Sequence, residues 1–468
     1  DELYFRDKII NVEEIQDQIE QTLFDCNCFK EAKAFILYRE EHKNIRFLHD
    51  RCKYIDEYAE SSENAATSSE TDGNANVSIK NVANLESEVY KSNNRKIQRY
   101  RMAKKLKELS PELSKQYEKD LESHIIYAHD ESSSPVPKYY CQAITLYPLL
   151  LDGTSKMDGL GTKPPHNLNS FCGQFINLLF LLSSQCKGAV GCAETFNFIT
   201  HFCELEWGKD FYKRENDVVT SSVCANQKTI KSCIEQAFQN IVYSINQPAG
   251  NRSYQSPFIN FNYFDKYYWN NLFETFAFPD GSKLNWEAVS YIQKLFMKWF
   301  NKERSKTLLT YPVESLCLLT DGENFKDEEY ADFAAEMWSE GHSFFVYTSD
   351  NPDAVASCCR LRNDITSMNT FSSTTGLTGV ATGSCNVITL NIAHILQDWV
   401  KDINNYSGSL LELKEDVEAI FKTFDSKTKV GAQNGTTAQF YVEGSADLDF
   451  AGFDMTLVGY KNASLAVQ

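Results

Sequence analysis

The sequence contains no Cys-x-x-Cys pair, although 14 of its 468 residues are cysteines. Structural zinc sites usually take their ligands from such pairs, so we expect no metal site in this chain. The first residues also lack the basic-then-apolar pattern that directs secretion. Without export a disulfide framework is not expected, and we predict a cytoplasmic chain with reduced thiols. Most cysteines would then pack in the core, which leaves a small subset for radical or redox chemistry.

Long hydrophobic runs and an excess of basic residues are missing as well. The longest strongly apolar run covers residues 178–182, whereas a membrane-spanning helix needs about 20 apolar residues. The 46 basic residues are outnumbered by 64 acidic ones, and the formal net charge is -18. Such a surface repels polyanions, so neither a membrane nor nucleic acid is expected as a partner. A helix N-terminus or a glycine-rich turn can still hold the phosphates of a nucleotide.

What the sequence does contain is a pair of adjacent cysteines, Cys358 and Cys359, between two strand-like runs at 344–348 and 387–390. Both runs have the length and the β-branched or aromatic composition of buried strands. The pair thus lies on a connection, where rigid scaffolds often present reactive groups. The following Arg360 would lower the pKa of a neighbouring thiol. The alternative is that the pair only fills space in the core, since cysteine is a common buried residue.

Three motifs resemble the catalytic core of an anaerobic (class III, glycyl-radical) ribonucleoside-triphosphate reductase, and they occur in the same order as in that family. They are Tyr-Pro-Val-Glu-Ser at 311–315, Ser-Cys-Cys-Arg-Leu-Arg-Asn at 357–363 and Thr-Gly-Ser at 382–384. The similarity extends from about Asn76 to the last residue. This resemblance implies an α/β fold. The expected architecture is a ten-stranded α/β barrel, made of two five-stranded parallel halves, that surrounds a finger loop. Alternating helical and strand-like stretches from 190 to 350 independently favour a mostly parallel α/β sheet or barrel.

The resemblance also implies roles for two cysteines. In the family the cysteine directly before the arginine becomes a thiyl radical, which here is Cys359, with Cys358 as the nearest competing candidate. In the same family a His-Asp segment also precedes a second cysteine, which lies on the first strand of the barrel. Here His129-Asp130 precedes Cys141, which would face the radical cysteine across the sugar. The alternative for Cys141 is an ordinary buried strand cysteine.

Further candidates are polar residues for the sugar and the phosphates. Ser384 and Asn391, on the strand after the finger loop, would contact the ribose, or they are ordinary strand residues. The proline-rich turn that ends in His166 and Asn167 opens a long helix at about Ser170. Such a helix start can hold a phosphate or a ribose hydroxyl. An ordinary helix cap explains this turn almost as well.

The N-terminal part reads as two helices between residues 12 and 42, because apolar residues recur there at helical spacing. It resembles the second half of an ATP-cone, the nucleotide-sensing module of many ribonucleotide reductases, and a plain helical hairpin is the alternative. We expect the first half of the cone to be absent, since the chain starts at Asp1. The small, polar and acidic residues 60–76 indicate a linker or flap.

A basic amphipathic helix is expected at 94–109, where Ser110-Pro111 would end it. The domains that we predict are a partial helical ATP-cone at 1–50, a linker or flap at 51–90, and a catalytic α/β barrel, incomplete at its C-terminus, at 91–468.

The function implied by the resemblance is the anaerobic reduction of ribonucleoside triphosphates to 2′-deoxyribonucleoside triphosphates for DNA synthesis. The implied effectors are ATP, dATP and other deoxynucleotides. A radical-SAM activase with an iron–sulfur cluster and S-adenosylmethionine would be a partner, and so would further copies of the chain in a homodimer or higher oligomer. The reductant, formate or a thioredoxin-like protein, stays open.

The family generates its thiyl radical from a glycyl radical in an Arg-Val-Cys-Gly-Tyr-like loop beside a four-cysteine zinc site. In this sequence Val458-Gly459-Tyr460 matches only the last letters of that motif. We therefore expect the radical-bearing glycine and the zinc in a C-terminal domain outside this chain, and we expect this chain alone to be inactive. Two alternatives remain: another glycyl-radical enzyme, such as an acyltransferase or a dehydratase, and a catalytically silent nucleotide-binding or assembly fragment.

Overall fold

The chain divides into two compact units in the computed structural model. One unit contains Asp1–Ser68 and Ile79–Asn81, and the other contains Ser69–Ser78 and Val82–Gln468. The structure describes residues 12–60, 82–136, 138, 140–153, 161–249, 255–352, 354–356, 362–364, 388–391 and 441–442. In these ranges no helix combines the length and the apolar character that crossing a membrane requires.

The first unit is a helical hairpin made of α1 (Val12–Asp25) and α2 (Phe29–Glu60). Arg39 on α2 forms ion pairs with Asp17 and Glu20 on α1, at 2.6 and 2.8 Å. One guanidinium group therefore joins the two helices. The two helices that the apolar spacing predicts are confirmed, and the second continues beyond its predicted end.

The second unit begins with α3 (Val82–Leu109) and α4 (Pro111–Glu122). Ser110 lies between them and caps α4, because its side chain accepts the N–H of Leu113 at 3.4 Å. Pro111 takes the first helical position, where its missing N–H has no consequence. The helix end predicted at Ser110-Pro111 is therefore confirmed, and the helix before it starts earlier than its sequence pattern predicts.

Helices occupy both ends of the segment that composition marks as a linker, residues 51–90. α2 continues to Glu60 and α3 starts at Val82, while residues 61–81 lie outside the described part of the chain. Composition does not separate an exposed helix from a coil, because both present polar side chains to water. The domain boundaries given above stay predictions.

Side chains of α3 hold the segment that leads to the main sheet. The amides of Asn94 and Gln98 donate to backbone carbonyls in and just after the short helix η3 (Glu131–Ser133), at 3.0 and 2.7 Å. Arg99 adds an ion pair with Glu131 at 2.8 Å. Asn94 and Gln98 are both buried, so these bonds are shielded from water and keep η3 against α3.

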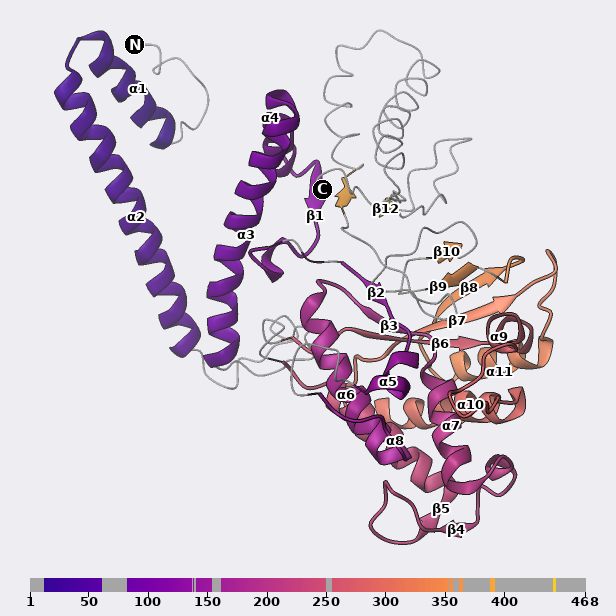
Figure 1. Ribbon diagram of the computed structural model, residues 1–468. Coiled ribbons are helices and arrows are strands. Elements are labelled where there is room, and N and C mark those ends of the chain that lie inside the picture. Colours follow the sequence, from indigo (N-terminus) through magenta and orange to yellow (C-terminus); the bar gives the residue numbers. More distant parts are fainter. Residues whose placement is uncertain are drawn as a thin grey trace. The chain divides into compact units, whose positions relative to one another are not determined.

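The centre of the second unit is a five-stranded parallel sheet (Figure 1). Its strands stand in the order of the sequence: β2 (Gln142–Ala143), β3 (Val190–Cys192), β6 (Ile259–Phe264), β7 (Val313–Leu319) and β8 (Phe345–Ser349). The predicted parallel α/β sheet is confirmed. An order that never reverses is the winding of a barrel half rather than of a doubly wound sheet. The ten-stranded barrel stays a prediction, because residues 365–387 lie outside the described part.

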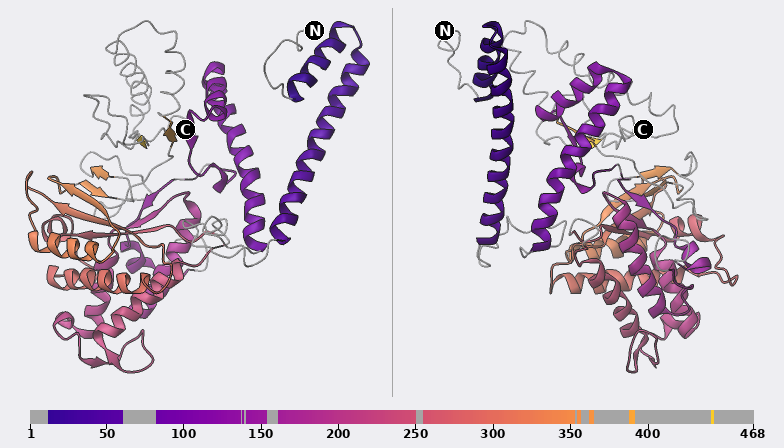
Figure 2. Two further views of the ribbon diagram at one scale, coloured as in Figure 1. Left: turned by 180° about the vertical axis from the view of Figure 1, so that it is seen from behind. Right: turned by 60° about the vertical axis from the view of Figure 1, so that its left-hand side comes forward.

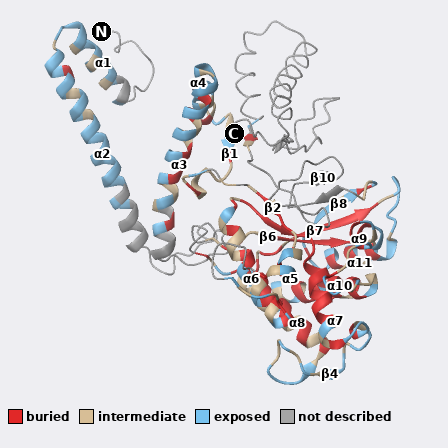
Figure 3. Cartoon of the chain, in the orientation of Figure 1, coloured by how far each residue is buried: buried red, intermediate tan, exposed pale blue. Residues whose placement is uncertain are grey.

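Helices cover one face of this sheet, as both views show (Figures 1 and 2). They are α5 (Tyr147–Asp152), α6 (Leu168–Gln185), α7 (Thr195–Trp207), α8 (Ile230–Ile245), α10 (Trp286–Arg304) and α11 (Glu328–Ser339). The buried residues concentrate where these helices meet the strands (Figure 3). Phe171 and Phe175 stack at 5.4 Å within α6, and Phe196 of α7 stacks on Tyr263 of β6 at 5.0 Å. Burial of aromatic surface therefore holds the helices on the sheet.

Shorter elements lie between these helices in the sequence. α9 (Lys266–Phe273) follows β6, and η4 (Phe211–Lys213) follows α7. A small antiparallel hairpin of β4 (Val218–Val219) and β5 (Lys228–Thr229) comes directly before α8.

β8 is the last strand of the described sheet, and it is more exposed than its composition predicts. Phe345 and Val346 are 45% and 37% exposed, so the prediction of a buried strand is wrong on this point. The reason is its position, because within the described part β8 pairs on one side only, with β7. An edge strand loses the second neighbour that would cover its side chains.

Two smaller sheets flank the cysteine pair in the sequence. β1 (Ile126–Ala128) pairs antiparallel with β11 (Ile388–Leu390), the second predicted strand, and β11 pairs in parallel with β12 (Tyr441–Val442). β9 (Ala354–Ala356) pairs antiparallel with β10 (Arg362–Asp364). Cys358 and Cys359 fall between β9 and β10 in the sequence, outside the described residues.

Candidate active site

Cys141 is buried at the start of the parallel sheet. It immediately precedes β2, is 6% exposed, and packs with Ala189 against Tyr140 and Phe258. Its Sγ accepts a hydrogen bond from the backbone N–H of Ala189 at 3.3 Å. A backbone donor is fixed by the strand that contains it, so the sulfur is held in a defined position. The structure places Cys141 at the first strand, as the resemblance implies, and its catalytic role stays a prediction.

Gly188 leaves the space that the Cys141 sulfur occupies. A Cβ at this position would lie 2.7 Å from Cys141 Sγ and 3.0 Å from both Cε1 and the carbonyl oxygen of Tyr140. The interior is close-packed, so a side chain here would push the sulfur away. Sequence analysis missed this residue. Its signal was a glycine between a helix and a buried strand, which often marks a close approach.

Polar side chains of β6 lie on the sheet face that carries Cys141. The register pairs Ala143 with Gly191, and Gly191 with Asn260. Side chains alternate along a strand, so residues two apart share a face. Cys141 lies two residues before Ala143, and Asn262 lies two residues after Asn260. All of these residues therefore belong to one face.

The two asparagines of β6 are almost fully buried on this face. Asn260 Nδ2 donates to Ser315 Oγ at 2.9 Å, and Asn262 Nδ2 lies 3.9 Å from Cys317 Sγ. Asn260 Oδ1 is buried without a hydrogen-bond partner among the described residues. A buried amide oxygen in that state needs a donor, which a ligand or water supplies. The sequence held a signal that we missed, because a strand with a purely structural role would have apolar residues where these asparagines stand.

His129 connects the lead-in to Cys141 with the strand that follows the cysteine pair. Its Nε2 lies 2.6 Å from Thr389 Oγ1 on β11. Its ring meets the Tyr140 ring edge-on, with centroids 6.3 Å apart. A chain of contacts therefore runs from β11 through His129 to the residue beside Cys141.

Asn391 directly follows β11 and is exposed. Its backbone N–H donates to the Ile125 carbonyl at 2.8 Å, which extends the pairing between β11 and β1. The structure thus brings Asn391 to the strand that leads toward Cys141, and its contact with the ribose stays a prediction. Ser384, Cys358 and Cys359 lie outside the described residues, so their placement relative to Cys141 also stays a prediction.

The helix start that the sequence suggests for a phosphate has internal hydrogen-bond partners. The side chain of Asn167, the N-cap of α6, accepts the N–H of Ser170 at 2.8 Å. The Ser170 hydroxyl accepts the N–H groups of His166 and Asn167, both at 3.1 Å. The Leu168 N–H donates to the Glu206 carboxylate at 2.9 Å. A carboxylate of the protein thus occupies the positive end of this helix. Binding of a phosphate by His166, Asn167 and Ser170 stays a prediction, and it would require Glu206 to move.

Burial keeps several core cysteines unreactive. Burial raises the pKa of Cys172 to about 12, and it raises the pKa of Cys192 and Cys203 well above the ordinary range. A thiol that stays protonated is a poor nucleophile and a poor metal ligand. Among the residues that the structure describes, no three His, Cys, Asp or Glu side chains are arranged to hold a metal ion. These cysteines are therefore packing residues.

Two family models match the sequence. The model for anaerobic ribonucleoside-triphosphate reductase matches residues 83–447, and the model for the ATP cone domain matches residues 2–44. No curated protein gives a significant match.

Solved structures of anaerobic ribonucleotide reductases are similar to this chain. The Thermotoga maritima reductase in complex with dATP and CTP is 28% identical, with a TM-score of 0.55, and the match covers 68% of this chain and 50% of that chain. Another anaerobic ribonucleotide reductase is 29% identical, with a TM-score of 0.57 and coverage of 73% and 50%. The T. maritima reductase with MES in the active site is 25% identical, with a TM-score of 0.57 and coverage of 77% and 59%.

This chain thus spans about half the length of the solved structures that it matches. The family model, in contrast, covers well over half of this chain, and its match at 83–447 includes both Cys141 and the adjacent cysteines. The chain therefore belongs to the anaerobic ribonucleoside-triphosphate reductase family.

Proposed function

We propose that this protein reduces ribonucleoside triphosphates to 2′-deoxyribonucleoside triphosphates without oxygen and so supplies DNA synthesis. The observation that carries the proposal is the position of Cys141, a buried thiol held by a backbone N–H at the first strand of a sheet that winds in one direction. The same sheet face presents buried asparagines, and the chain belongs to the reductase family. Radical chemistry needs such an enclosed site, because bulk water and oxygen destroy the intermediates.

Two thiols share the chemistry in this proposal. A thiyl radical on Cys359 takes the 3′-hydrogen atom of the ribose, and the 2′-hydroxyl then takes up a proton and leaves as water. The sugar is then a C2′ radical with a ketone at C3′. Cys141, on the opposite face of the sugar, gives a hydrogen atom to C2′ and becomes a thiyl radical. The reductant returns a hydrogen atom to Cys141 and adds one electron, together with a proton, to the ketone, which forms the C3′ radical again. Cys359 finally returns the 3′-hydrogen and becomes a thiyl radical again. Each turnover consumes two electrons, which formate or a dithiol protein of the thioredoxin class supplies.

The family's glycyl radical supplies the unpaired electron that Cys359 needs, and a radical-SAM activase with its iron–sulfur cluster generates that radical. The zinc that the family carries beside the glycine has no set of ligands among the described residues of this chain. No step is therefore assigned to zinc. What the described residues contribute is the fixed position of one thiol and the polar face around it.

The polar groups of the chain orient the sugar in this proposal. Ser384 and Asn391 contact the ribose hydroxyls. Asn260 adds an acceptor on the face of Cys141, since its buried Oδ1 has no partner in the described part of the chain. A hydroxyl or a water at the bound sugar would supply the missing donor.

Nucleotides also regulate the enzyme in this proposal. One T. maritima structure is described with dATP bound in the specificity site, and the ATP cone match at residues 2–44 supports a nucleotide-sensing module in this chain. We infer that ATP, dATP and other deoxynucleotides are its effectors. The working form is a homodimer or a higher oligomer, as the family resemblance implies.

A pair of adjacent substitutions tests the proposal. The full-length protein, with its radical-bearing glycine, is activated and incubated anaerobically with a ribonucleoside triphosphate, and the deoxynucleotide product is separated by chromatography. We expect Cys359→Ser to form no product, because oxygen at this position cannot carry the thiyl radical, and Cys358→Ser to remain active. Deoxynucleotide formation by Cys359→Ser would overturn the assignment, and equal losses in both variants would leave no reason to prefer Cys359.

A further inference from the structure

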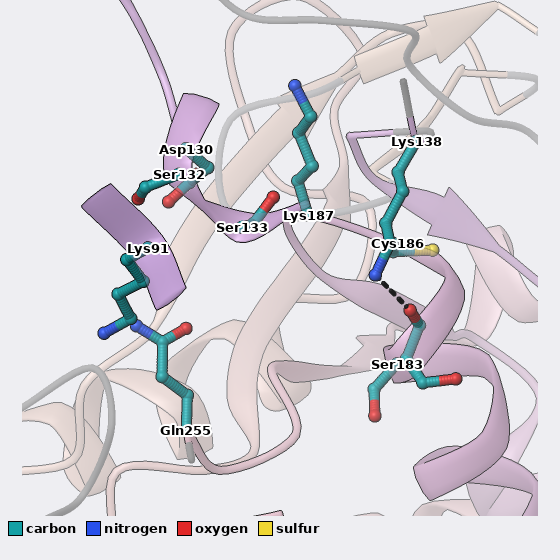
Figure 4. Close-up of a pocket in the computed structure, with 10 residues that line it drawn as sticks. Lys91, Asp130, Ser132, Ser133, Lys138, Ser183, Cys186, Lys187 and Gln255 are labelled. Atoms are coloured by element: carbon teal, nitrogen blue, oxygen red, sulfur yellow. Dashed lines mark hydrogen bonds between the residues drawn. The ribbon is translucent and has the colours of Figure 1, made fainter. Parts of the chain in front are cut away.

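A small pocket lies where the segment before β2, the end of α6 and the helix α3 meet (Figure 4). Three lysines line it, Lys91, Lys138 and Lys187, together with one acid, Asp130, and the hydroxyl of Ser133. We propose that this pocket binds a phosphate group, either inorganic phosphate or a phosphate of a nucleotide. The site goes beyond the proposed function, because none of these five residues belongs to the candidate active site.

Positive charge predominates in the pocket although the chain as a whole is acidic, with a net charge of -18. Three ammonium groups against the carboxylate of Asp130 leave two positive charges among the lining residues. The neighbouring Glu131 is engaged by Arg99 at 2.8 Å. Burial lowers the pKa of Lys187, although Asp130 and Glu131 act in the opposite direction. An anion beside this lysine would therefore stabilise its charged form.

The hydroxyl of Ser133 provides the second observation. Ser133 Oγ is buried and has no hydrogen-bond partner among the described residues. Ser183 and Ser184, at the end of α6, instead donate to carbonyls of their own helix, at 3.0 and 2.6 Å. Hydroxyls without a partner are rare inside proteins, because they lose their bonds to water and gain nothing in return. A donor in that state beside ammonium groups is suited to an oxyanion.

The surrounding structure holds these groups in place before any ligand arrives. Lys138 Nζ donates to the Ser184 carbonyl at 2.7 Å, which fixes its ammonium group at the pocket wall (Figure 4). Asn94 and Gln98 fasten α3 to the backbone around η3, at 3.0 and 2.7 Å. Lys91 and Ser133 are therefore carried by elements that are tied to each other. A phosphate has two negative charges and several acceptor oxygens, so it matches both the charge and the donors of this pocket better than a monoanion.

Calorimetric titration of the protein with inorganic phosphate, and separately with ATP, tests the site at constant ionic strength. We expect Lys187→Met to weaken binding about tenfold, since it removes a charge-assisted hydrogen bond. Lys187→Arg, which keeps the charge, and Lys326→Met, a change at an exposed lysine of the same unit, should bind like the unmodified protein. Ser133→Ala should weaken binding by a smaller factor.

Ser133→Ala removes a single oxygen, so it keeps the proposal testable even if Lys187→Met does not fold. Competition between phosphate and ATP for the variant-sensitive site identifies the ligand as a nucleotide, and phosphate binding without competition identifies it as the free ion. ATP bound elsewhere does not interfere, because the readout is the difference between variants. The proposal is overturned if the protein binds neither ligand, or if Lys187→Met and Ser133→Ala leave both affinities unchanged.

Discussion

The sulfur of Cys141 has little freedom, because Ala189 fixes it with an N–H group and Gly188 leaves just enough room for it. We predict that Gly188→Ala displaces the sulfur and slows deoxynucleotide formation by up to about 100-fold, since a displacement of about 1 Å of a reacting group can have an effect of this size. The free energy of unfolding should fall by only about 1–3 kcal/mol through overpacking. An anaerobic product assay of the full-length protein and urea unfolding of the same preparation measure both effects.

Gly173 offers a matched control, because a Cβ at this position in α6 meets no atom within 4 Å apart from the neighbouring backbone of its own helix. Alanine is favoured over glycine inside a helix by roughly 0.5–1 kcal/mol, so Gly173→Ala should keep full activity and gain a little stability. Equal activity in the two alanine variants would show that the position of the Cys141 sulfur does not limit the reaction.

Removal of the Cys141 thiol should separate the two halves of the reaction. In the full-length protein Cys141→Ala keeps Cys359, so the 3′-hydrogen of the substrate should still exchange with solvent while no deoxynucleotide forms. Mass spectrometry of substrate recovered from heavy water measures the exchange. Cys186→Ala is the control, because Cys186 is also buried but its Sγ contacts Gln142 Oε1 at 3.5 Å, and this variant should complete the reduction. If Cys141→Ala lost both the hydrogen exchange and the product, the role proposed here for Cys141 would be wrong.

At the scale of elements, the start of α6 depends on a carboxylate from α7. Glu206 accepts the N–H of Leu168 at 2.9 Å and the N–H of Ser222 at 3.2 Å, so it joins α6, α7 and the hairpin of β4 and β5. We predict that Glu206→Ala lowers the free energy of unfolding by about 1–3 kcal/mol, because it leaves these donors without an acceptor. Glu206→Gln keeps one acceptor oxygen and should lose less. Urea unfolding compares the two, and no loss in Glu206→Ala would mean that water replaces the carboxylate.

The elements whose signals are local were predictable from the sequence. Apolar residues at helical spacing locate α1 and the first part of α2, strand composition locates β8 and β11, and Ser110-Pro111 marks a helix boundary. The exposure of β8 was not predictable, because it depends on which strands lie beside it rather than on its own residues.

Many contacts around the candidate site were also not predictable, because they depend on neighbours that are distant in the sequence. Resemblance identified Cys141, but its contact with Gly188 joins residues 47 positions apart in the printed sequence. The carboxylate of Glu206 reaches a helix start 38 residues away. Contacts of this kind are set by how the strands and helices pack, and no local pattern reports them.

At the scale of the second unit, buried thiols should make the fold sensitive to alkali. Unfolded thiols titrate near 9.0, whereas burial raises the pKa of Cys172 to about 12. A group whose folded pKa is raised contributes stability that is complete below the unfolded pKa and is lost as the pH rises through the folded pKa. The free energy of unfolding should therefore decline between pH 9.0 and about 12. The pKa of Tyr263 is also raised by burial, which adds to the decline.

Urea unfolding at a series of pH values measures this decline, and Cys172→Ala should make the slope shallower by removing one of the titrating groups. The variant loses some stability at every pH because it leaves a cavity, so the slope rather than the absolute value is the test. A free energy of unfolding that stays constant across this range would contradict the prediction.

The order of the strands also bears on how the protein is synthesised. Each strand of the parallel sheet pairs with the strand made just before it, so a chain emerging from the ribosome extends the sheet from β2 to β8 without waiting for later residues. β1 belongs to a different sheet, and its partner β11 follows only after a long interval, shown by the 260 positions between His129 and Thr389. The lead-in to Cys141 therefore stays unpaired until the ribosome has passed both adjacent cysteines. The pairing of β1 with β11 can form only after both predicted catalytic thiols have been synthesised.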